Sequence, residues 1–385
     1  MSASGEKPYR VYRGGRVKGK VPAPARPTRG TRGPTDYRGP GAVPKRRRIG
    51  RGRLIGLILL VLLLLVIVWA VASWFAVANG VSDANARLDP NAKLALSHQS
   101  GLLLSHSTTV LLLGTDNARV GGREGDRHSD SIMLMRTDPS HHRLYYLSIP
   151  RDLVVPIPGV GTQKINAAFQ VGGPALAIRT VHDFTSLPIN HVVVVNFADF
   201  KDLINALGGI DVNVPSPIRS NRFDCPYSTQ ARCDQWPGWR FAKGTQHMNG
   251  ERALIYSRIR ENQLNPAETD FTRGARQQAV LNAVASKLTS LGTLLRLPFS
   301  GASFVKPLTT DLTTSQLLQL GWVKFRSDSG SSVHCRLGGD FGGGGTGAPS
   351  EDNPTAIAMF LGKSAPQPPT GQFEPGCVMG HTLQQ

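Results

Sequence analysis

The longest uninterrupted apolar run lies near the start of the chain, from Leu54 to Val77, and its 24 residues include no charged side chain. A helix rises about 1.5 Å per residue, so this run covers about 36 Å, enough to cross a hydrocarbon core of about 30 Å. It shows no polar face, which argues against a core helix. No small-x-small cleavage site follows, which argues against a cleaved signal peptide. The pattern predicts one transmembrane signal-anchor over 54–77.

Charged residues on either side of this run predict its orientation. Lys45 and five arginines between 46 and 53 precede it, whereas Asp83 and Asp89 follow it. The positive-inside rule therefore places the N-terminus in the cytoplasm and the large C-terminal part outside the plasma membrane. Two tryptophans near the end of the run lie where interfacial aromatic residues are typical.

Beyond residue 107, short apolar runs typical of buried strands alternate with segments of helical spacing. The predicted strands cover 110–114, 131–136, 144–149 and 191–196, and the predicted helices cover 174–184, 198–207 and 270–291. This interleaving predicts an α/β fold, a three-layer α/β/α domain with a central mixed sheet over 107–325, preceded by the transmembrane helix. Residues 78–106 are interpreted as a membrane-proximal connector. The Gly/Pro-rich residues 326–385 are interpreted as a C-terminal extension, poorly ordered in its last part.

The formal net charge of +18 would favour an anionic partner if it lay on the folded domain. Residues 1–53, however, carry 16 Lys and Arg against Glu6 and Asp36, and the remainder holds 28 basic and 24 acidic residues. The basic segment has few aliphatic residues and is interpreted as a disordered cytoplasmic tail. Such a tail can contact RNA or DNA, but its place before an apolar run favours a role in membrane orientation, and no nucleic-acid partner is expected.

All four cysteines lie beyond the apolar run. An even number of cysteines in an exported domain favours disulfides. Three pairings are possible, and proximity in the sequence favours Cys225–Cys233 and Cys335–Cys377. Neither spacing resembles a zinc site.

Two aspartates mark the ends of predicted strands. Asp116 ends the strand that begins near Val110, and Asp130 follows a Gly-rich excursion. A strand end and a flexible loop can bring two carboxylates together, and such a pair suits Mg²⁺, which leaves room for phosphate oxygens. The alternative is that both aspartates only cap turns.

Basic side chains also gather at element ends. Pro150 stops a strand and projects Arg151 from its end, a usual place for functional residues in open α/β sheets. If 256–260 is extended, Arg258 and Arg260 share one face. Asp270, Arg273, Arg276 and Gln277 lie on the first turns of a long helix, at spacings of three and four. Each could be a solvated surface residue, but together they favour a polyanionic ligand, a phosphate or pyrophosphate.

These motifs follow one another in a fixed order over residues 107–290. They are Leu-Leu-Leu-Gly-Thr-Asp at 111–116, Ser129-Asp130-Ser131, Ser148-Ile149-Pro150-Arg151-Asp152, Lys164 to Ala168, Asn249-Gly250 through Arg260, and Asp270-Phe271-x-Arg273 leading to Arg276-Gln277-Gln278. The series resembles the LytR–CpsA–Psr family.

The resemblance implies a phosphotransferase that moves a glycopolymer from a polyprenyl-pyrophosphate carrier at the bilayer onto a peptidoglycan hydroxyl. It implies an apolar groove for the polyprenyl chain and Mg²⁺ held by Asp116 and Asp130. The residues implied at the pyrophosphate are Arg151, Arg258, Arg260, Arg273 and Gln277, with Arg151, Arg258 and Arg260 also in catalytic roles. Asp270 is implied as a general base or as an orienting partner of the arginines.

One departure from the family pattern affects this assignment. Many relatives have Arg directly before the Ser-Asp pair, where this chain has His128, so Arg127 is a further candidate for pyrophosphate binding. A non-catalytic lipid- or wall-polymer-binding protein and an envelope-related transcriptional attenuator are the alternative functions. The sequence shows no helix-turn-helix motif, and a domain outside the membrane has no access to DNA, which argues against a DNA-binding attenuator. Pyrophosphate hydrolysis, with water as acceptor, is a possible side reaction at the same site.

Overall fold

A computed structural model describes residues 51–117, 127–223, 225–265, 268, 270–341 and 346–380. The chain divides into two compact units, Met1–Leu57 and Ile58–Gln385. Of the first unit the described part is the start of helix α1 (Arg51–Ala86). This helix is long and apolar enough to cross a membrane, and none of its most apolar stretch is buried. It is the candidate single-pass anchor that the sequence predicted.

The helix runs beyond the predicted anchor and enters the folded part of the second unit. Val77, Val81 and Ala84 are buried in a small cluster with Val305 of α8 (Leu291–Val305). The short helix α2 (Pro90–Ala95) begins at the cap Asp89 and packs on α3 (Ala167–Thr185). Residues 78–106 are therefore packed segments of the domain and not only a connector.

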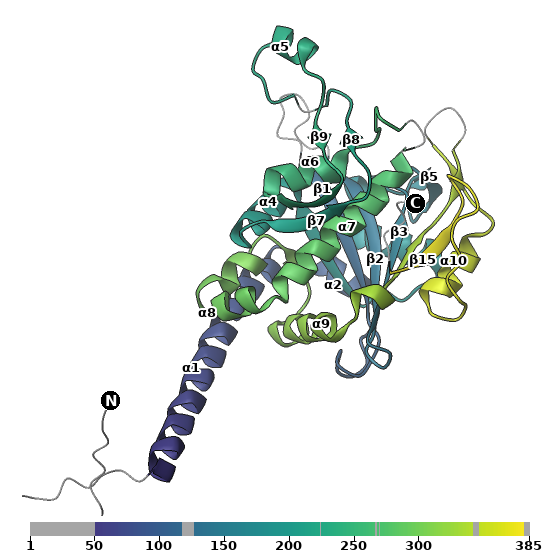
Figure 1. The fold of residues 1–385 in the computed structure, drawn as a ribbon. Helices are drawn as coiled ribbons and strands as arrows, with labels where there is room; N and C mark the ends of the chain where they lie inside the picture. The colour runs from purple at the N-terminus through teal and green to yellow at the C-terminus, as the bar shows by residue number, and fades with distance from the viewer. Residues whose placement is uncertain are drawn as a thin grey trace, which may run out of the picture. The chain divides into compact units, whose positions relative to one another are not determined.

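The core of the domain is a seven-stranded sheet with the order β11-β6-β1-β2-β3-β12-β15 (Figure 1). Its strands are β1 (Thr109–Asn117), β2 (Arg127–Asp138), β3 (Arg143–Ile149), β6 (His191–Asn196), β11 (Thr309–Thr310), β12 (Val333–Arg336) and β15 (Gly376–Met379). β1 is antiparallel to β2 and parallel to β6, and β3 is parallel to β12, so the sheet is mixed as predicted.

Side chains alternate between the two faces of this sheet, as the pleat requires. Leu134 and Leu147 belong to a large cluster with α2, α3 and α10 (Asn353–Phe360). Their neighbours Met133 and Tyr146 pack instead with Val323 of α9 (Thr314–Arg326) and with α7 (Asp270–Leu288). Helices therefore cover both faces, which confirms the three-layer α/β/α prediction.

A second core lies beside the sheet, where α7 packs with α4 (Phe197–Ala206) and α6 (Gly250–Arg258) over the pair formed by β7 (Ile210–Val214) and β10 (Gly244–Met248). The remaining elements are small: β4 (Val154–Ile157), β5 (Gly161–Lys164), β8 (Ile218–Arg219), α5 (Gln230–Gln235), β9 (Arg240–Phe241), the 3-10 turn Ser329–Ser331, β13 (Gly339–Asp340) and β14 (Ala348–Pro349).

The end of the chain completes the sheet, which the sequence did not predict. β12 and β15 both lie within 326–385, the segment interpreted as a C-terminal extension, and β15 lies in its last part, which was interpreted as poorly ordered. The strands are short and separated by Gly- and Pro-rich chain, so no apolar period marks them locally. Their pairing is also covalent, since a disulfide joins Cys335 to Cys377, and the second disulfide joins Cys225 to Cys233. Both favoured pairings are confirmed.

We expect the Cys335–Cys377 bond to be the more stabilising of the two. Its cysteines are buried and 42 residues apart, whereas the other pair is separated by 8 residues on an exposed loop. By loop-closure entropy the longer loop contributes about 4 kcal/mol and the shorter one about 2.5 kcal/mol. Urea unfolding of C335A/C377A should show the larger loss, with C225A/C233A as the matched control. Equal losses would contradict this assignment.

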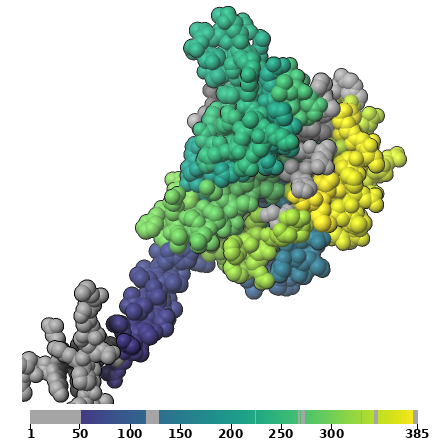
Figure 2. Space-filling view, viewed as in Figure 1, coloured from purple at the N-terminus to yellow at the C-terminus, as the bar shows by residue number. Residues whose placement is uncertain are grey.

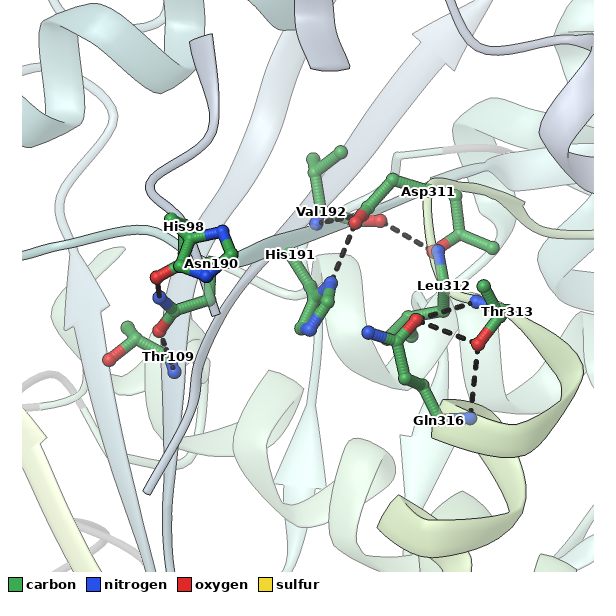
Figure 3. A network of polar contacts seen from close by, with 10 residues as sticks. His98, Thr109, Asn190, His191, Val192, Asp311, Leu312, Thr313 and Gln316 are labelled. Atoms are coloured by element: carbon green, nitrogen blue, oxygen red, sulfur yellow. Dashed lines mark hydrogen bonds and ion pairs between the residues drawn. The ribbon is translucent and has the colours of Figure 1, made fainter. Parts of the chain in front are cut away.

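A polar network fixes the edge of the sheet where β6 begins (Figure 3). Nδ1 of the buried His191 lies 2.6 Å from Asp311 Oδ2, and Val192 N donates to Asp311 Oδ1 over 2.7 Å. Asn190 Oδ1 accepts a hydrogen bond from Thr109 N, which ties the start of β6 to the start of β1. The network lies at the beginning of both strands, so their opposite ends are left for the site.

Candidate functional site

The polar motifs meet at one edge of the sheet because of strand direction. β1 and β3 end at this edge, β6 ends there too, and β2 begins there. Gly114 pairs with Ser131 and Thr115 pairs with Ser129, so Asp130 is an extra residue in a β-bulge. A bulge leaves its extra residue outside the ladder and re-aims its side chain. The bulge therefore directs the Asp130 carboxylate away from the regular ladder at this edge of the sheet.

Arg151, just beyond β3, pairs with that carboxylate. Its Nη1 donates to Asp130 Oδ1 and its Nε donates to Asp152 Oδ2 over 3.3 Å. Lys164 Nζ donates to the other oxygen of Asp152 over 2.8 Å. Burial acts to raise the pKa of Asp152, but the Lys164 hydrogen bond and the charges of Arg151, Lys164 and Arg273 outweigh it, so the pKa is lowered. Asp152 is thus an anionic brace that orients Arg151.

The segment 256–260, whose arginines would share one face if it were extended, is mostly helical. Arg258 is the last residue of α6, and the chain becomes extended at Ile259. Asn249 caps this helix by accepting a hydrogen bond from Arg252 N. Every residue from 253 to 257 is buried, and three of them belong to the second core. The condition of an extended segment is therefore not met, because a run this short does not show by its period whether it is helix or strand.

Five of the predicted residues nonetheless line one cavity of about 280 Å³. They are Asp130, Arg258, Arg260, Arg273 and Gln277. Three guanidiniums and one carboxylate give the wall a net positive charge, and Arg151 reaches it through Asp130. Guanidinium groups bind phosphate oxygens through paired N–H donors. A cavity of this charge suits a small polyanion.

Helix α7 brings Arg273 and Gln277 to this cavity. Its first turns approach β3 closely, since a Cβ at Gly274 would lie 2.9 Å from Ser148 Oγ. A side chain at this position would force the Ser148 hydroxyl to move, so glycine suits this approach of the helix to the strand. Residues four apart on the helix share one side, so Arg273 and Gln277 face the cavity together.

Arg276 was grouped with these residues in the sequence, but the structure places it elsewhere. Its side chain is almost fully buried, its Nη1 pairs with Glu268 Oε2 at 2.9 Å, and its Nη2 donates to the carbonyl oxygen of Ile259 over 2.6 Å. Ile259 lies between Arg258 and Arg260. Arg276 therefore positions the arginine pair without lining the cavity.

Three predicted site residues have side chains outside the described residues: Asp116, Arg127 and Asp270. The backbone still locates the first two, because Asp116 pairs with His128 and Arg127 with Asn117 at the same edge of the sheet. Among the side chains that the structure describes, no three His, Cys, Asp or Glu gather into a metal site.

Aromatic and neutral residues complete the cavity, and the sequence motifs did not single them out. The guanidinium of Arg258 lies 5.0 Å from the ring centre of Phe197 and 6.0 Å from that of Phe223. Asn221 and Ser257 also line the wall. Phe223 lies two residues before the disulfide-closed loop that leads into α5 (Figure 1), and Trp239 Nε1 donates to its carbonyl oxygen over 3.1 Å. The only sequence signal for Phe197 was its place directly after the predicted strand 191–196, at the end where site residues are expected.

A second, apolar cavity of about 430 Å³ lies between the sheet and helices α7, α8 and α9. Met135 and Tyr146 of the sheet, Ala285 of α7, Leu297 of α8 and Trp322 of α9 contribute to its wall. Gln277 and Ala285 are eight positions apart on α7, which is about 12 Å along the helix. One helix therefore carries residues of the polar cavity at one end and of the apolar cavity at the other.

Comparison with known proteins gives a consistent picture. The LytR_cpsA_psr family model matches residues 71–334. Over 192 residues the chain is 36% identical to the polyisoprenyl-teichoic acid–peptidoglycan teichoic acid transferase TagV of Bacillus subtilis, covering 49% of this chain and 46% of the relative. Over 217 residues it is 34% identical to TagU of Bacillus mycoides, covering 56% and 64%. The match thus spans only about half to two thirds of these relatives' length.

Solved structures share the fold. B. subtilis TagV superposes with a TM-score of 0.52 at 28% identity, covering 67% of this chain and 97% of that one. TagT bound to LIIa-WTA has a TM-score of 0.53 at 28% identity, covering 69% and 94%. A TagT structure with bound octaprenyl pyrophosphate lipid has a TM-score of 0.50 at 26% identity, with the same coverage. With the family model matching well over half of its length, the chain belongs to the LytR–CpsA–Psr family.

Proposed function

We propose that this protein transfers a glycopolymer from a polyprenyl-pyrophosphate carrier to a peptidoglycan hydroxyl and releases polyprenyl phosphate. The observation that carries the proposal is the succession of an arginine-lined cavity and an apolar cavity along α7. A polyprenyl pyrophosphate has the same succession of a dianionic head and an apolar tail. Relatives named as teichoic acid transferases and a TagT structure with octaprenyl pyrophosphate support the assignment.

The reaction requires charge neutralisation and alignment more than covalent help. The acceptor hydroxyl attacks the glycan-side phosphorus, the bridging P–O bond breaks, and its electron pair leaves with polyprenyl phosphate. Arg258, Arg260 and Arg273 would bind the pyrophosphate oxygens, with Arg151 oriented toward them by Asp130 and Asp152. Gln277 would donate a further hydrogen bond. The hydroxyl proton needs an acceptor, and Asp270 at the start of α7 is the proposed base.

Magnesium is proposed as the cofactor, with Asp130 and Asp116 as its protein ligands. The donor set fits, because Asp130 leaves the regular ladder at a bulge and the backbone of Asp116 lies on the neighbouring strand at the same edge. Few protein carboxylates are needed, since Mg²⁺ keeps water and phosphate oxygens as its other ligands. When bound, the ion would neutralise charge that develops on the phosphate oxygens.

The proposed location is the plasma membrane, with α1 as a single-pass anchor, the basic N-terminus in the cytoplasm and the catalytic domain outside. The charge asymmetry around 54–77 supports this orientation. The energy for transfer is already present in the pyrophosphate bond, so the reaction outside the membrane needs no ATP. Tethering also keeps the enzyme beside its lipid substrate.

The test is a reconstituted reaction with the purified full-length protein. It is incubated with a synthetic polyprenyl-pyrophosphate glycan, with and without peptidoglycan, in Mg²⁺ or EDTA. Metal-dependent release of polyprenyl phosphate, with label transferred to peptidoglycan, is expected. Release without transfer would indicate pyrophosphate hydrolysis. Tight lipid binding with no phosphorus chemistry would favour a non-catalytic binding protein and sink the transferase proposal.

Filling the apolar cavity should weaken the use of long-chain donors. Ala285 lines this cavity and Ser286, its neighbour on α7, is exposed. Each buried methylene contributes about 0.8 kcal/mol, so A285F, which displaces several, is expected to raise the KM for a long-chain donor at least about 10-fold. A donor with a single isoprene unit should be unaffected, and S286F should behave as wild type. An unchanged KM for A285F would show that the polyprenyl chain binds outside this cavity.

A further inference from the structure

Helix α8 exposes large apolar side chains on one of its sides. Leu291 is 71% exposed, Leu295 60% and Phe299 88%. These residues are four apart, so they lie along one side of the helix, and together they are named the α8 face. Other sides of the helix are packed, with Phe304 and Val305 buried in neighbouring clusters. A row of exposed apolar side chains of this kind marks a surface for a partner.

Contacts with α1 set the position of this face. Trp69 Nε1 of α1 lies 3.5 Å from the carbonyl oxygen of Leu295. Further along, a Cβ at Gly80 would lie 2.9 Å from the carbonyl oxygen of Ala302, and Arg87 donates to the carbonyl oxygens of Lys306 and Leu308. The contacts advance along both helices in the same direction, so α8 lies beside the end of α1, as Figure 2 also shows.

The level of Leu295 relative to a membrane follows from helix length. A transmembrane helix needs about 20 apolar residues. Counted from Leu54, that length ends beyond Trp69, the residue of α1 that contacts Leu295. Leu295 is therefore level with the outer end of the span, and Leu291 is a turn deeper. The α8 face continues the apolar surface of the anchor itself.

The apolar cavity opens among the same helices. Leu294 and Leu297 of α8 line it, as do Trp322 and Phe325 of α9, whose side chains are half exposed. Val77 of α1 also contributes to its wall. α1 and α8, which contact each other at the level of the membrane, therefore form part of the border of this cavity.

We propose that the α8 face inserts into the outer leaflet of the bilayer and is a second membrane contact beside the α1 anchor. Inserted in this way, α8 holds the apolar cavity at the lipid surface, and a polyprenyl chain passes sideways from the leaflet into it. Arg296, exposed on the same helix, reaches phosphate headgroups from this position. The proposed membrane contact does not depend on the proposed transferase function, whereas the proposed entry of the lipid donor does.

The insertion is tested with full-length protein in nanodiscs. All four native cysteines are paired in disulfides, so an introduced cysteine is a single labelling site. L295C and F299C carry an environment-sensitive fluorophore, and V171C, an exposed apolar position on α3, is the matched control. Nitroxide-labelled lipids should quench the label at 295 and 299 at least about three times more than at 171, and aqueous iodide should show the reverse order.

Two results would overturn the proposal. Equal lipid quenching at 295, 299 and 171 would place the α8 face in water. Protection of 295 and 299 from both lipid and aqueous quenchers would indicate a protein partner or a second copy of the chain.

The entry of the donor has its own assay. L295E/F299E should lower transfer from a long-chain donor embedded in the bilayer about 10-fold while leaving transfer from a soluble single-isoprene donor unchanged. Equal rates with the embedded donor would exclude entry past α8. If wild-type protein transfers neither donor, the proposed reaction fails while the quenching result still decides the membrane contact.

Discussion

Replacing Arg151 by alanine is expected to lower the rate of glycopolymer transfer by about 10³-fold or more. Arg151 is the second residue after β3, it pairs with Asp130 in the bulge of β2, and Asp152 braces the same guanidinium. Removing one preorganised donor to developing phosphate or oxyanion charge costs about 10²–10³ in turnover, and arginines in phosphoryl transfer reach about 10³–10⁵. The loss should fall on turnover more than on donor affinity, because Arg258, Arg260 and Arg273 remain.

The measurement is single-turnover release of polyprenyl phosphate by R151A, D130N and the double variant. Asp130 pairs with Arg151 and is also a proposed Mg²⁺ ligand, so D130N should lose at least as much activity as R151A. Because either change already breaks the shared ion pair, the double variant should lose less than the product of the two single losses. R179A, which removes an exposed arginine of α3, a helix on the face of the sheet opposite α7, is the charge-matched control and should retain full activity. Retention of more than a tenth of the wild-type rate by R151A would remove Arg151 from the catalytic set.

Replacing Arg276 by alanine is expected to cost both stability and activity. The change leaves Glu268 without its buried partner and removes the donor to the Ile259 carbonyl oxygen. Breaking a buried ion pair by removing one partner costs about 3–5 kcal/mol of unfolding free energy. Because Ile259 separates Arg258 from Arg260, the variant should also lose order in the arginine pair and bind the donor more weakly.

A neighbouring substitution separates these two effects. Gln277 follows Arg276 on α7 but lines the polar cavity. Q277A should weaken donor binding with little change in the urea midpoint, whereas R276A should lower both. Full stability of R276A would show that the Glu268 pair contributes little to the fold, and full activity at wild-type stability would remove its positioning role.

The two cavities and the α8 face give the proposed function a spatial order. The polar cavity lies where strands β1, β3 and β6 end, and the apolar cavity lies beyond it along α7. A lipid entering beside α8 would reach the arginines with its pyrophosphate while its tail stays among α7, α8 and α9. Phe223, just before the loop closed by Cys225–Cys233, lines the polar cavity, so this insert begins at the wall of the cavity.

Local pattern determined much of the fold. The strand at His191–Asn196 has the predicted bounds, and the helices at 198–207 and 270–291 differ from α4 and α7 by at most a few residues. These elements have long or strongly apolar patterns, and such patterns depend on near neighbours in the chain. The candidate residues were also found locally, because an Asp or Arg directly after an apolar strand is visible without knowing what the strand pairs with.

Only the tertiary structure decided which of these residues work together. Arg273 and Arg276 look alike in the sequence, yet one lines the cavity and the other is buried against Glu268. β12 and β15 are too short to be recognised alone. They become strands because β3 offers an edge to β12 and β12 in turn offers one to β15. The apolar cavity is made by side chains far apart in the sequence and has no local signature. The α8 face has a local spacing of four, but the sequence does not show that these three side chains stay exposed, because burial depends on what surrounds a residue and periodicity along one segment does not record it.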